Sequence, residues 1–321
     1  MNAAARLVLA VALLAAGLAQ GRDWPENPVT IVVPFPAGGP SDIAARPVAL
    51  GLAKAFDKLF VIENHPGEGG NAGAALVARS APDGYTLLIS SSGPIVINPS
   101  LYRELAYDPR RDLAPVTALL RVPLVLAVHP SVPANNLQEL MALIRKQDGK
   151  LRYASAGNGT PQHLTAELFR TVAGLRMAHV PYQGSADAID DLLAARIPMM
   201  FDSTVAIIPY IKSGKLRPIA VTGVRRAREL PQVPTFAEAG LRGVESYAWY
   251  GLFARAGTPP EIVRKLNAET IRVMRSPEFQ SVLRETGSDY VGDTPDNFAR
   301  FIGAETDKWA VIVKASGATV D

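Results

Sequence analysis

The sequence predicts an α/β protein of two lobes, each built on a mixed, mostly parallel sheet flanked by helices. Short β-branched apolar runs alternate with segments in which apolar residues recur every three or four positions, the pattern of strands alternating with amphipathic helices. Three of these strands end in glycine-rich loops that open a helix, at 37–42, 66–73 and 157–163. A chain of 321 residues is also long enough to bury two cores.

The elements are expected in a regular order along the chain. Apolar runs predict strands at 29–35, 59–63, 85–90, 123–128, 151–155, 177–181, 198–202, 216–222 and 247–254. Helical periodicity predicts helices at 41–56, 71–80, 135–147, 161–174, 185–194 and 259–275. Two further helices, 277–286 and 294–315, close the chain, and the second begins with Thr294 as its N-cap and Pro295 in its first turn.

The strands at 123–128 and 247–254 bracket a central section that is an α/β unit by itself. If both strands cross between lobes, the first and last thirds of the chain form one lobe and the middle forms the other. We therefore expect lobe 1 to comprise residues 24–125 and 248–321, and lobe 2 to comprise residues 126–247.

Residues 1–21 have the shape of a secretory signal peptide. Arg6 precedes an apolar stretch from Leu7 to Ala19, followed by small and polar residues. At about 1.5 Å per residue the stretch spans roughly 20 Å, shorter than the ~30 Å core that a membrane helix must cross. We expect export, cleavage after either Ala19 or Gly21, and a mature chain that is soluble in an exported compartment.

Composition excludes several classes of function. The chain has no cysteine, so disulfides, thiol catalysis and a lipoprotein anchor are excluded. The formal net charge is only +3, and the densest basic run, at 225–228, lacks interleaved aromatic residues, so we expect no nucleic-acid partner. The histidines lack metal-ligand spacing, and the nucleophile-elbow, zinc-protease and P-loop motifs are missing from the sequence. We expect no metal, no cofactor and no catalytic residue.

The glycine-rich loops are candidate anion sites. A helix start presents unpaired N–H groups and the positive end of the helix dipole, and glycine allows a ligand to approach them. The simpler interpretation of the first loop is a turn in which Ser41 or Asp42 caps the helix. The second loop matches a dinucleotide fingerprint at 67–72, but it follows the second strand and no acidic strand end lies about 20 residues later, which argues against a nucleotide.

Taken together, the segments VTIVVPFPAGGPSDIAAR, VIENHPGEGGNAGAALVARSAPDGYTLL, LRYASAGNGTPQHLTAELF and YAWYGLFARAGTPPEIV resemble the substrate-binding subunits of the tripartite tricarboxylate transporter family, in particular the Bug-type extracytoplasmic receptors. The resemblance covers nearly all of the mature chain. It implies a periplasmic binding protein of the type II-like fold whose lobes, joined by two crossing strands, close on a small carboxylate. It also implies membrane permease subunits as partners, a monomeric receptor and no enzyme activity. A ligand sensor of the same fold is the alternative.

The same resemblance implies a set of ligand-binding residues on each lobe. In lobe 1 these are Ala37, Gly38, Gly39, Asp42, Gly69, Gly70, Ser90, Ser91 and Ser92. In lobe 2 they are Ser155, Gly157, Gly159, Thr160, His163, Tyr182, Gly184, Asp202 and Ser203.

Several of these assignments leave the ligand open. Asp202 either caps the helix from Thr204 or receives the ammonium group of an amino acid, and Tyr182 or Phe35 could stack on an aromatic acid. His163 is more often a structural residue, and an exported hydrolase using it with Ser155 or Thr160 would lack an acid to orient the imidazole.

Three positions depart from the family pattern: His65 replaces a common arginine, Glu68 a common alanine and Ala195 a common glycine. A Glu68 side chain in the cleft would disfavour a highly charged ligand such as citrate. That expectation holds only if the side chain does not point to solvent.

Overall fold

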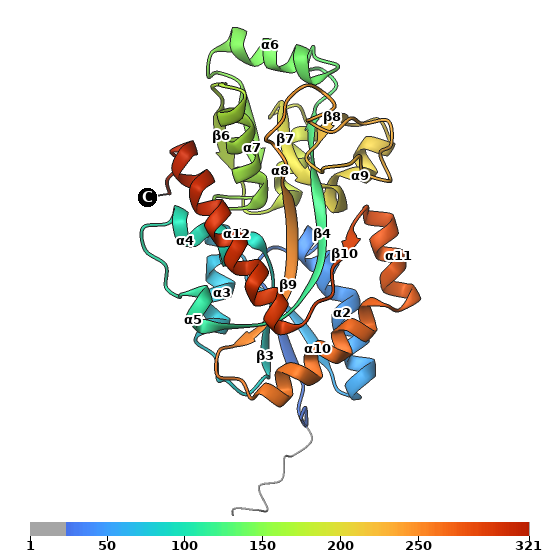
Figure 1. Cartoon of the computed structure of the whole chain (residues 1–321). Helices are drawn as coiled ribbons and strands as arrows, with labels where there is room; N and C mark the ends of the chain where they lie inside the picture. The colour runs from blue at the N-terminus through green and yellow to red at the C-terminus, as the bar shows by residue number, and fades with distance from the viewer. Residues whose placement is uncertain (1–23, 321) are drawn as a thin grey trace, which may run out of the picture.

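The computed structural model describes residues 24–320, so the predicted signal peptide lies outside the described residues. Its strands form two sheets that share one long strand, β4 (Leu113–Val128). The first part of β4 pairs antiparallel with β9 (Tyr247–Arg255), and its last part with β7 (Met199–Ser203) and β8 (Arg217–Val221). The pairing changes after Pro123, so β4 runs from one lobe into the other beside the start of β9 (Figure 1).

The first sheet has parallel strands β2 (Phe60–Asn64), β1 (Val29–Val33) and β3 (Thr86–Ser91), followed by antiparallel β9 and β4. The two-residue strand β10 (Asp289–Tyr290) pairs with β4.

Helices cover both faces of this sheet. The helices α2 (Pro40–Phe56) and α10 (Pro260–Met274) share a core with Ile31 and Val33, whereas α3 (Asn71–Ala78) and α12 (Pro295–Ser316) share one with Val32. Alternate side chains of β1 therefore enter opposite cores, which is why residues 31–33 are all apolar.

The second sheet contains parallel β6 (Ala178–Pro181), β5 (Arg152–Ser155) and β7, followed by antiparallel β4 and β8. The helices α6 (Leu137–Gln147) and α7 (Pro161–Val172) pack on the face of Met199, and α8 (Ser185–Leu193) and α9 (Thr204–Lys212) on that of Met200. The predicted α/β fold of two lobes with mixed sheets is therefore confirmed.

The two C-terminal helices pack against the rest of the protein. Helix α11 (Pro277–Thr286) follows α10, and α12 runs along the first lobe toward α7 of the second (Figure 1). There Arg170 Nη2 donates to the carbonyl oxygen of Ser316 at 2.7 Å. Within residues 24–320, no helix combines the length and the apolar character needed to cross a membrane.

Some elements were not predicted. Strand β4 begins at Leu113, ten residues before the predicted start at 123. Pro115 and Pro123 interrupt its apolar run, and proline is unusual inside a strand. Register shifts on either side of Thr117 accommodate this irregular stretch. The short segments η1 (Glu68–Gly70), η2 (Gly93–Ile97), α4 (Asn98–Leu101) and α5 (Pro109–Asp112) were also missed.

Candidate ligand-binding cleft

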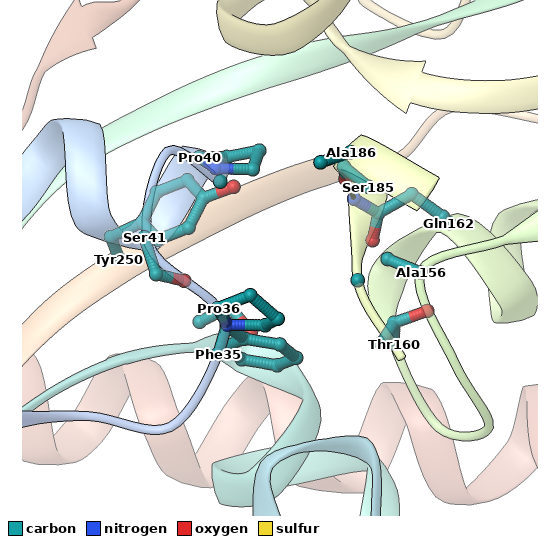
Figure 2. A pocket seen from close by; sticks show the side chains of 13 residues that line it. Phe35, Pro36, Pro40, Ser41, Ala156, Thr160, Gln162, Ser185, Ala186 and Tyr250 are labelled. Carbon is teal, nitrogen blue, oxygen red and sulfur yellow. Dashed lines mark hydrogen bonds between the residues drawn. The ribbon is translucent and has the colours of Figure 1, made fainter. Parts of the chain in front are cut away.

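A small cavity of about 20 Å³ lies between the two lobes. Its walls carry hydroxyl, amide and apolar groups, from Phe35, Pro36, Gly39, Pro40, Ser41, Ser91, Ala156, Thr160, Gln162, Gly184, Ser185, Ala186 and Tyr250. Figure 2 shows the side chains of Pro40, Ser41 and Tyr250 on one side of the cavity and those of Gln162 and Ser185 on the other. Because β9, which carries Tyr250, is one of the strands at the lobe junction, the cavity lies where the lobes meet.

Three helices begin at this cavity. Their N-caps are Gly39 of α2, Thr160 of α7 and Gly184 of α8, and all three line it. The first N–H groups of a helix have no partner within the helix, and the helix dipole places partial positive charge there. Among the described residues, none that lines the cavity is charged. An anion in this cavity would therefore be held by helix ends and neutral polar groups from both lobes.

The lobes touch each other beside the cavity. A Cβ atom on Gly93 of the first lobe would lie 2.7 Å from the carbonyl oxygen of Gly159 on the second, and one on Gly184 would lie 3.0 Å from Pro36 Cδ. Gly69 approaches the carbonyl oxygen of Asn158 so closely that no Cβ would fit between them. The structure is therefore a closed arrangement in which backbone meets backbone.

Asp42 holds the first glycine loop in shape. Its carboxylate accepts hydrogen bonds from Gly38 N at 2.9 Å, Arg46 Nε at 2.7 Å and Asn64 Nδ2 at 3.2 Å. Burial opposes ionisation of this group, but these hydrogen bonds outweigh it and hold the pKa of Asp42 below its usual range. Because the carboxylate bonds to its own loop, Asp42 stabilises the conformation of the loop that forms this part of the cavity wall, and it does not line the cavity itself.

Hydroxyl groups within the third glycine loop bond mainly to the loop itself. Thr160 Oγ1 donates to the carbonyl oxygen of Gly157 at 2.7 Å. Ser155 Oγ accepts from Gly157 N at 3.2 Å and lies 2.7 Å from His179 Nε2. These contacts set the loop conformation that places Thr160 at the start of α7.

Two stacked histidines support this loop from inside. The rings of His163 and His179 are 3.9 Å apart between centroids and nearly parallel, at 6°. Gly159 N donates to His163 Nδ1 at 3.2 Å, which requires that nitrogen to be unprotonated. Burial, with Arg170 nearby, lowers the pKa of His163 to about 4, and burial beside His163 lowers the pKa of His179 to about 3. Both rings are therefore neutral at neutral pH.

Asp202 lies behind two of the lining residues and has no exposed surface. Its Oδ1 accepts from Gln162 Nε2 at 2.9 Å and from Ser203 N at 2.7 Å, whereas Oδ2 has no hydrogen-bond partner in the part of the chain that the structure describes. Burial raises the pKa of Asp202 to about 6, against the opposing effect of these hydrogen bonds. The N-cap of α9 is Ser203, so Asp202 does not cap that helix.

The structure brings only part of the predicted set to the cavity wall. Gly39, Ser91, Thr160 and Gly184 line it. The other predicted residues lie outside that lining, in the loops, in the contact between the lobes or behind the wall; they are Ala37, Gly38, Asp42, Gly69, Gly70, Ser90, Ser92, Ser155, Gly157, Gly159, His163, Tyr182, Asp202 and Ser203.

Two side chains with proposed roles point elsewhere. The hydroxyl of Tyr182 donates to Asp191 Oδ2 at 2.7 Å. Glu68 is exposed and lines a separate surface pocket with Arg79 and Glu104. The condition on which Glu68 was expected to disfavour citrate is therefore not met.

Nine lining residues were absent from the predicted ligand-binding set, although Phe35 was named as a residue that could stack on an aromatic acid; they are Phe35, Pro36, Pro40, Ser41, Ala156, Gln162, Ser185, Ala186 and Tyr250. Most of them are sequence neighbours of predicted loop residues, so the three helix starts lie at the cavity but the predicted set does not include much of its lining. Tyr250 sits inside a strand whose residues are almost all buried, and nothing in the sequence distinguishes it.

The fold and this inter-lobe cavity define a two-lobed solute-binding protein of the periplasmic type. The model of the tripartite tricarboxylate transporter family receptor matches residues 44–318, and the chain belongs to that family. Protein BugT of Bordetella pertussis is 34% identical over 315 residues, which is 97% of each chain.

Two solved structures extend the comparison. An R. palustris protein solved with adipate is 38% identical, covers 93% of this chain and 100% of its own, and superposes with a TM-score of 0.90. MatC from Rhodopseudomonas palustris, with bound malate, is 32% identical, covers 90% and 100%, and has a TM-score of 0.87. The relatives therefore include structures with bound carboxylates.

Proposed function

We propose that the protein is a periplasmic receptor that captures a small carboxylate between its lobes and delivers it to membrane permease subunits of a tripartite tricarboxylate-type transporter. The observation that carries this proposal is the convergence of three helix N-termini, from both lobes, on a cavity whose described lining has no charged side chain. Such a cavity suits an anion and offers no nucleophile with an activating base. The adipate and malate in the related structures support a carboxylate ligand.

Capture follows from the different contacts of the open and closed lobes. A carboxylate in the cavity contacts α2 of one lobe and α7 and α8 of the other only when the lobes are closed, so binding shifts the equilibrium toward closure. We propose residues 24–125 and 248–321 as one moving body and 126–247 as the other, with β4 and β9 as the connection. A Kd near 1 μM corresponds to about −8.2 kcal/mol, which a few charge-assisted hydrogen bonds and burial can supply.

Delivery requires export. Removal of residues 1–21 by signal peptidase would leave a receptor that begins just before the first described residue, Trp24. The closed form, with ligand enclosed, is the form that we propose the permease recognises. A monomer suffices, because both halves of the cavity come from one chain.

A ligand screen on the mature chain tests the proposal. Malate, adipate, aspartate and benzoate would be added singly and unfolding followed by temperature, with sulfate as the control for a general anion effect. A ligand at 100 times its Kd should raise the unfolding free energy by about 2.7 kcal/mol. If none of the carboxylates raises the unfolding temperature more than sulfate does, the proposed function is wrong.

Two serine variants locate the site. Ser41→Ala removes a hydroxyl from the cavity wall at the start of α2, whereas Ser213→Ala removes one that donates to the carbonyl oxygen of Tyr210 on the exposed surface. The first variant should weaken binding by several-fold in calorimetry, and the second should bind like the parent protein. Equal affinities in both variants would place the ligand elsewhere.

A further inference from the structure

Within residues 24–320, no cationic side chain pairs with the buried carboxyl of Asp202. Its neighbours come from each element packed around it and are Gln162 of α7, Ser185 of α8, Ser203 before α9, Tyr250 of β9 and its register partner Val125 of β4. Of these only Tyr250 can ionise, and burial beside Asp202 raises the pKa of that phenol above its ordinary value, so it stays neutral. An ionised Asp202 would therefore be a buried charge without a cation.

Asp202 is also close to any ligand in the cavity. Gln162 and Ser185 line the cavity, and Gln162 Nε2 donates to Asp202 Oδ1 at 2.9 Å and to Ser185 Oγ at 3.4 Å. One layer of side chains thus separates the Asp202 carboxyl from the ligand position. Two carboxylates held this close in a dehydrated site cannot both ionise at low cost, and the pKa of one of them rises.

We propose that Asp202 takes up one proton when the cleft closes on its ligand, so that the receptor binds a carboxylate and a proton together. This rests on the proposed function, because it needs an anionic ligand in the cavity. The proton comes from solvent and adds to Oδ2, the oxygen without a partner, while Oδ1 keeps its hydrogen bonds from Gln162 and Ser203. Ser203 Oγ, near this carboxyl and also without a partner, can accept a hydrogen bond from the new O–H.

Burial and ligand charge act in the same direction on this group. Burial in the closed structure already brings the pKa of Asp202 to about 6, and a bound carboxylate moves its titration further toward neutral pH. Opening the lobes admits water to the second-lobe wall, which restores hydration of the charged form. Ligand binding, closure and protonation of Asp202 are therefore linked.

Calorimetry measures the proton directly. Malate and adipate, both fully ionised at pH 7.5, would be titrated into the mature chain in buffers that differ in ionisation enthalpy. We expect uptake of a large fraction of one proton per ligand and a Kd that rises by up to tenfold per pH unit between pH 7 and 9. Asp202→Asn, which keeps the shape of the protonated group, should bind with no uptake and with a Kd independent of pH.

Asp187→Asn is the matched control, because Asp187 is an exposed carboxylate in the first turn of the neighbouring helix α8. That variant should keep both the proton uptake and the pH dependence. If Asp202→Asn does not fold, a ¹³C NMR titration of carboxyl-labelled parent protein supplies the second measurement. The expected result is that one buried aspartate carboxyl becomes protonated when malate is added at pH 7.5.

The outcomes separate the two proposals. Carboxylate binding without uptake, or with uptake that survives Asp202→Asn, overturns the role of Asp202 and leaves the receptor function standing. Aspartate binding that is lost in Asp202→Asn and shows no uptake also overturns it, because an ionised Asp202 would then be receiving the ammonium group. If no carboxylate binds at all, both proposals fail.

Discussion

Gly93 is the position where lobe closure can be tested without touching the ligand. It begins η2 in the first lobe and its backbone is not left-handed, so alanine fits its local conformation. An alanine Cβ would nevertheless lie 2.7 Å from the carbonyl oxygen of Gly159 in the second lobe. Cβ atoms do not normally approach an oxygen within about 3.0 Å, so Gly93→Ala forces the lobes apart by a few tenths of an ångström.

The expected loss of affinity is large because the clash exists in the closed form and not in the open form. In the open form the new methyl group does not contact the second lobe. Alanine also stabilises a helical turn relative to glycine, by about 0.5–1 kcal/mol. In the closed form the methyl presses on backbone, which no rotamer change can relieve, and overpacking of this kind costs about 1–3 kcal/mol. We therefore expect the Kd for malate to rise on the order of ten- to a hundredfold, while the unfolding free energy of the open, ligand-free protein rises by no more than about 1 kcal/mol.

Gly303→Ala is the matched control for this measurement. Gly303 lies in helix α12 with an ordinary backbone and nothing within 4 Å of the Cβ position. Calorimetry with malate and urea denaturation would be run on both variants, with small-angle scattering to compare the dimensions of each with ligand. If Gly93→Ala binds malate as tightly as Gly303→Ala, the backbone contact between lobes is not a requirement of binding.

The remaining predictions concern stability. Because the pKa of His163 is lowered to about 4 and that of His179 to about 3, from 6.5, the unfolded chain binds more protons below pH 6.5. Stability should therefore fall toward pH 4 by up to about 2.7 kcal/mol per pH unit, less steeply in His163→Gln, as thermal unfolding from pH 4 to 7 would show. Asp202 contributes a pH dependence of stability of the opposite sign. Its pKa is raised from 3.8 to about 6, so between these pH values the native state binds the extra proton, and stability falls as the pH rises. Asp202→Asn should therefore stabilise the protein by up to about 3 kcal/mol at pH 7 and by little at pH 4 in urea denaturation, and an equal gain at both pH values would contradict this. Ala195 has a left-handed φ of 59°, so Ala195→Gly should raise the unfolding free energy by about 1 kcal/mol, and a loss would show that this strain is absent.

The order of strands and helices was predictable because each element carries its own periodicity. The β-branched run before Pro34 and the capped start at Thr294 are local signals that tertiary contacts did not override. The full length of β4 was not predictable, because its first half is held by pairing with β9 across more than a hundred residues, and its prolines gave the wrong local signal. Ala195 shows the same limit, since its left-handed backbone follows from the turn that ends α8 rather than from its own preference.

The site was predictable as a place but not as a set of side chains. Glycine before a helix marks where a backbone can meet an anion, and this signal found Gly39, Thr160 and Gly184. A polar side chain in such a loop can turn toward a ligand or back into the loop, and sequence alone cannot decide between the two. Asp42 and His163 turn back, because each meets a backbone N–H four residues away.

A cavity that binds anions through helix ends gains little selectivity from the anion itself. Backbone N–H groups in the first turn of a helix are preorganised and lose no side-chain entropy on binding. They donate hydrogen bonds to any carboxylate that reaches them. Discrimination must then come from the neutral groups around the rest of the ligand, Ser41, Gln162 and Tyr250, and from what fixes their hydrogen bonds. Asp202 Oδ1 accepts from Gln162 Nε2 whether or not Oδ2 carries a proton, so Gln162 directs its amide N–H₂ to Asp202 and Ser185. Under the proposed function, Asp202 therefore acts on the ligand through the orientation of Gln162, because Asp202 itself does not line the cavity.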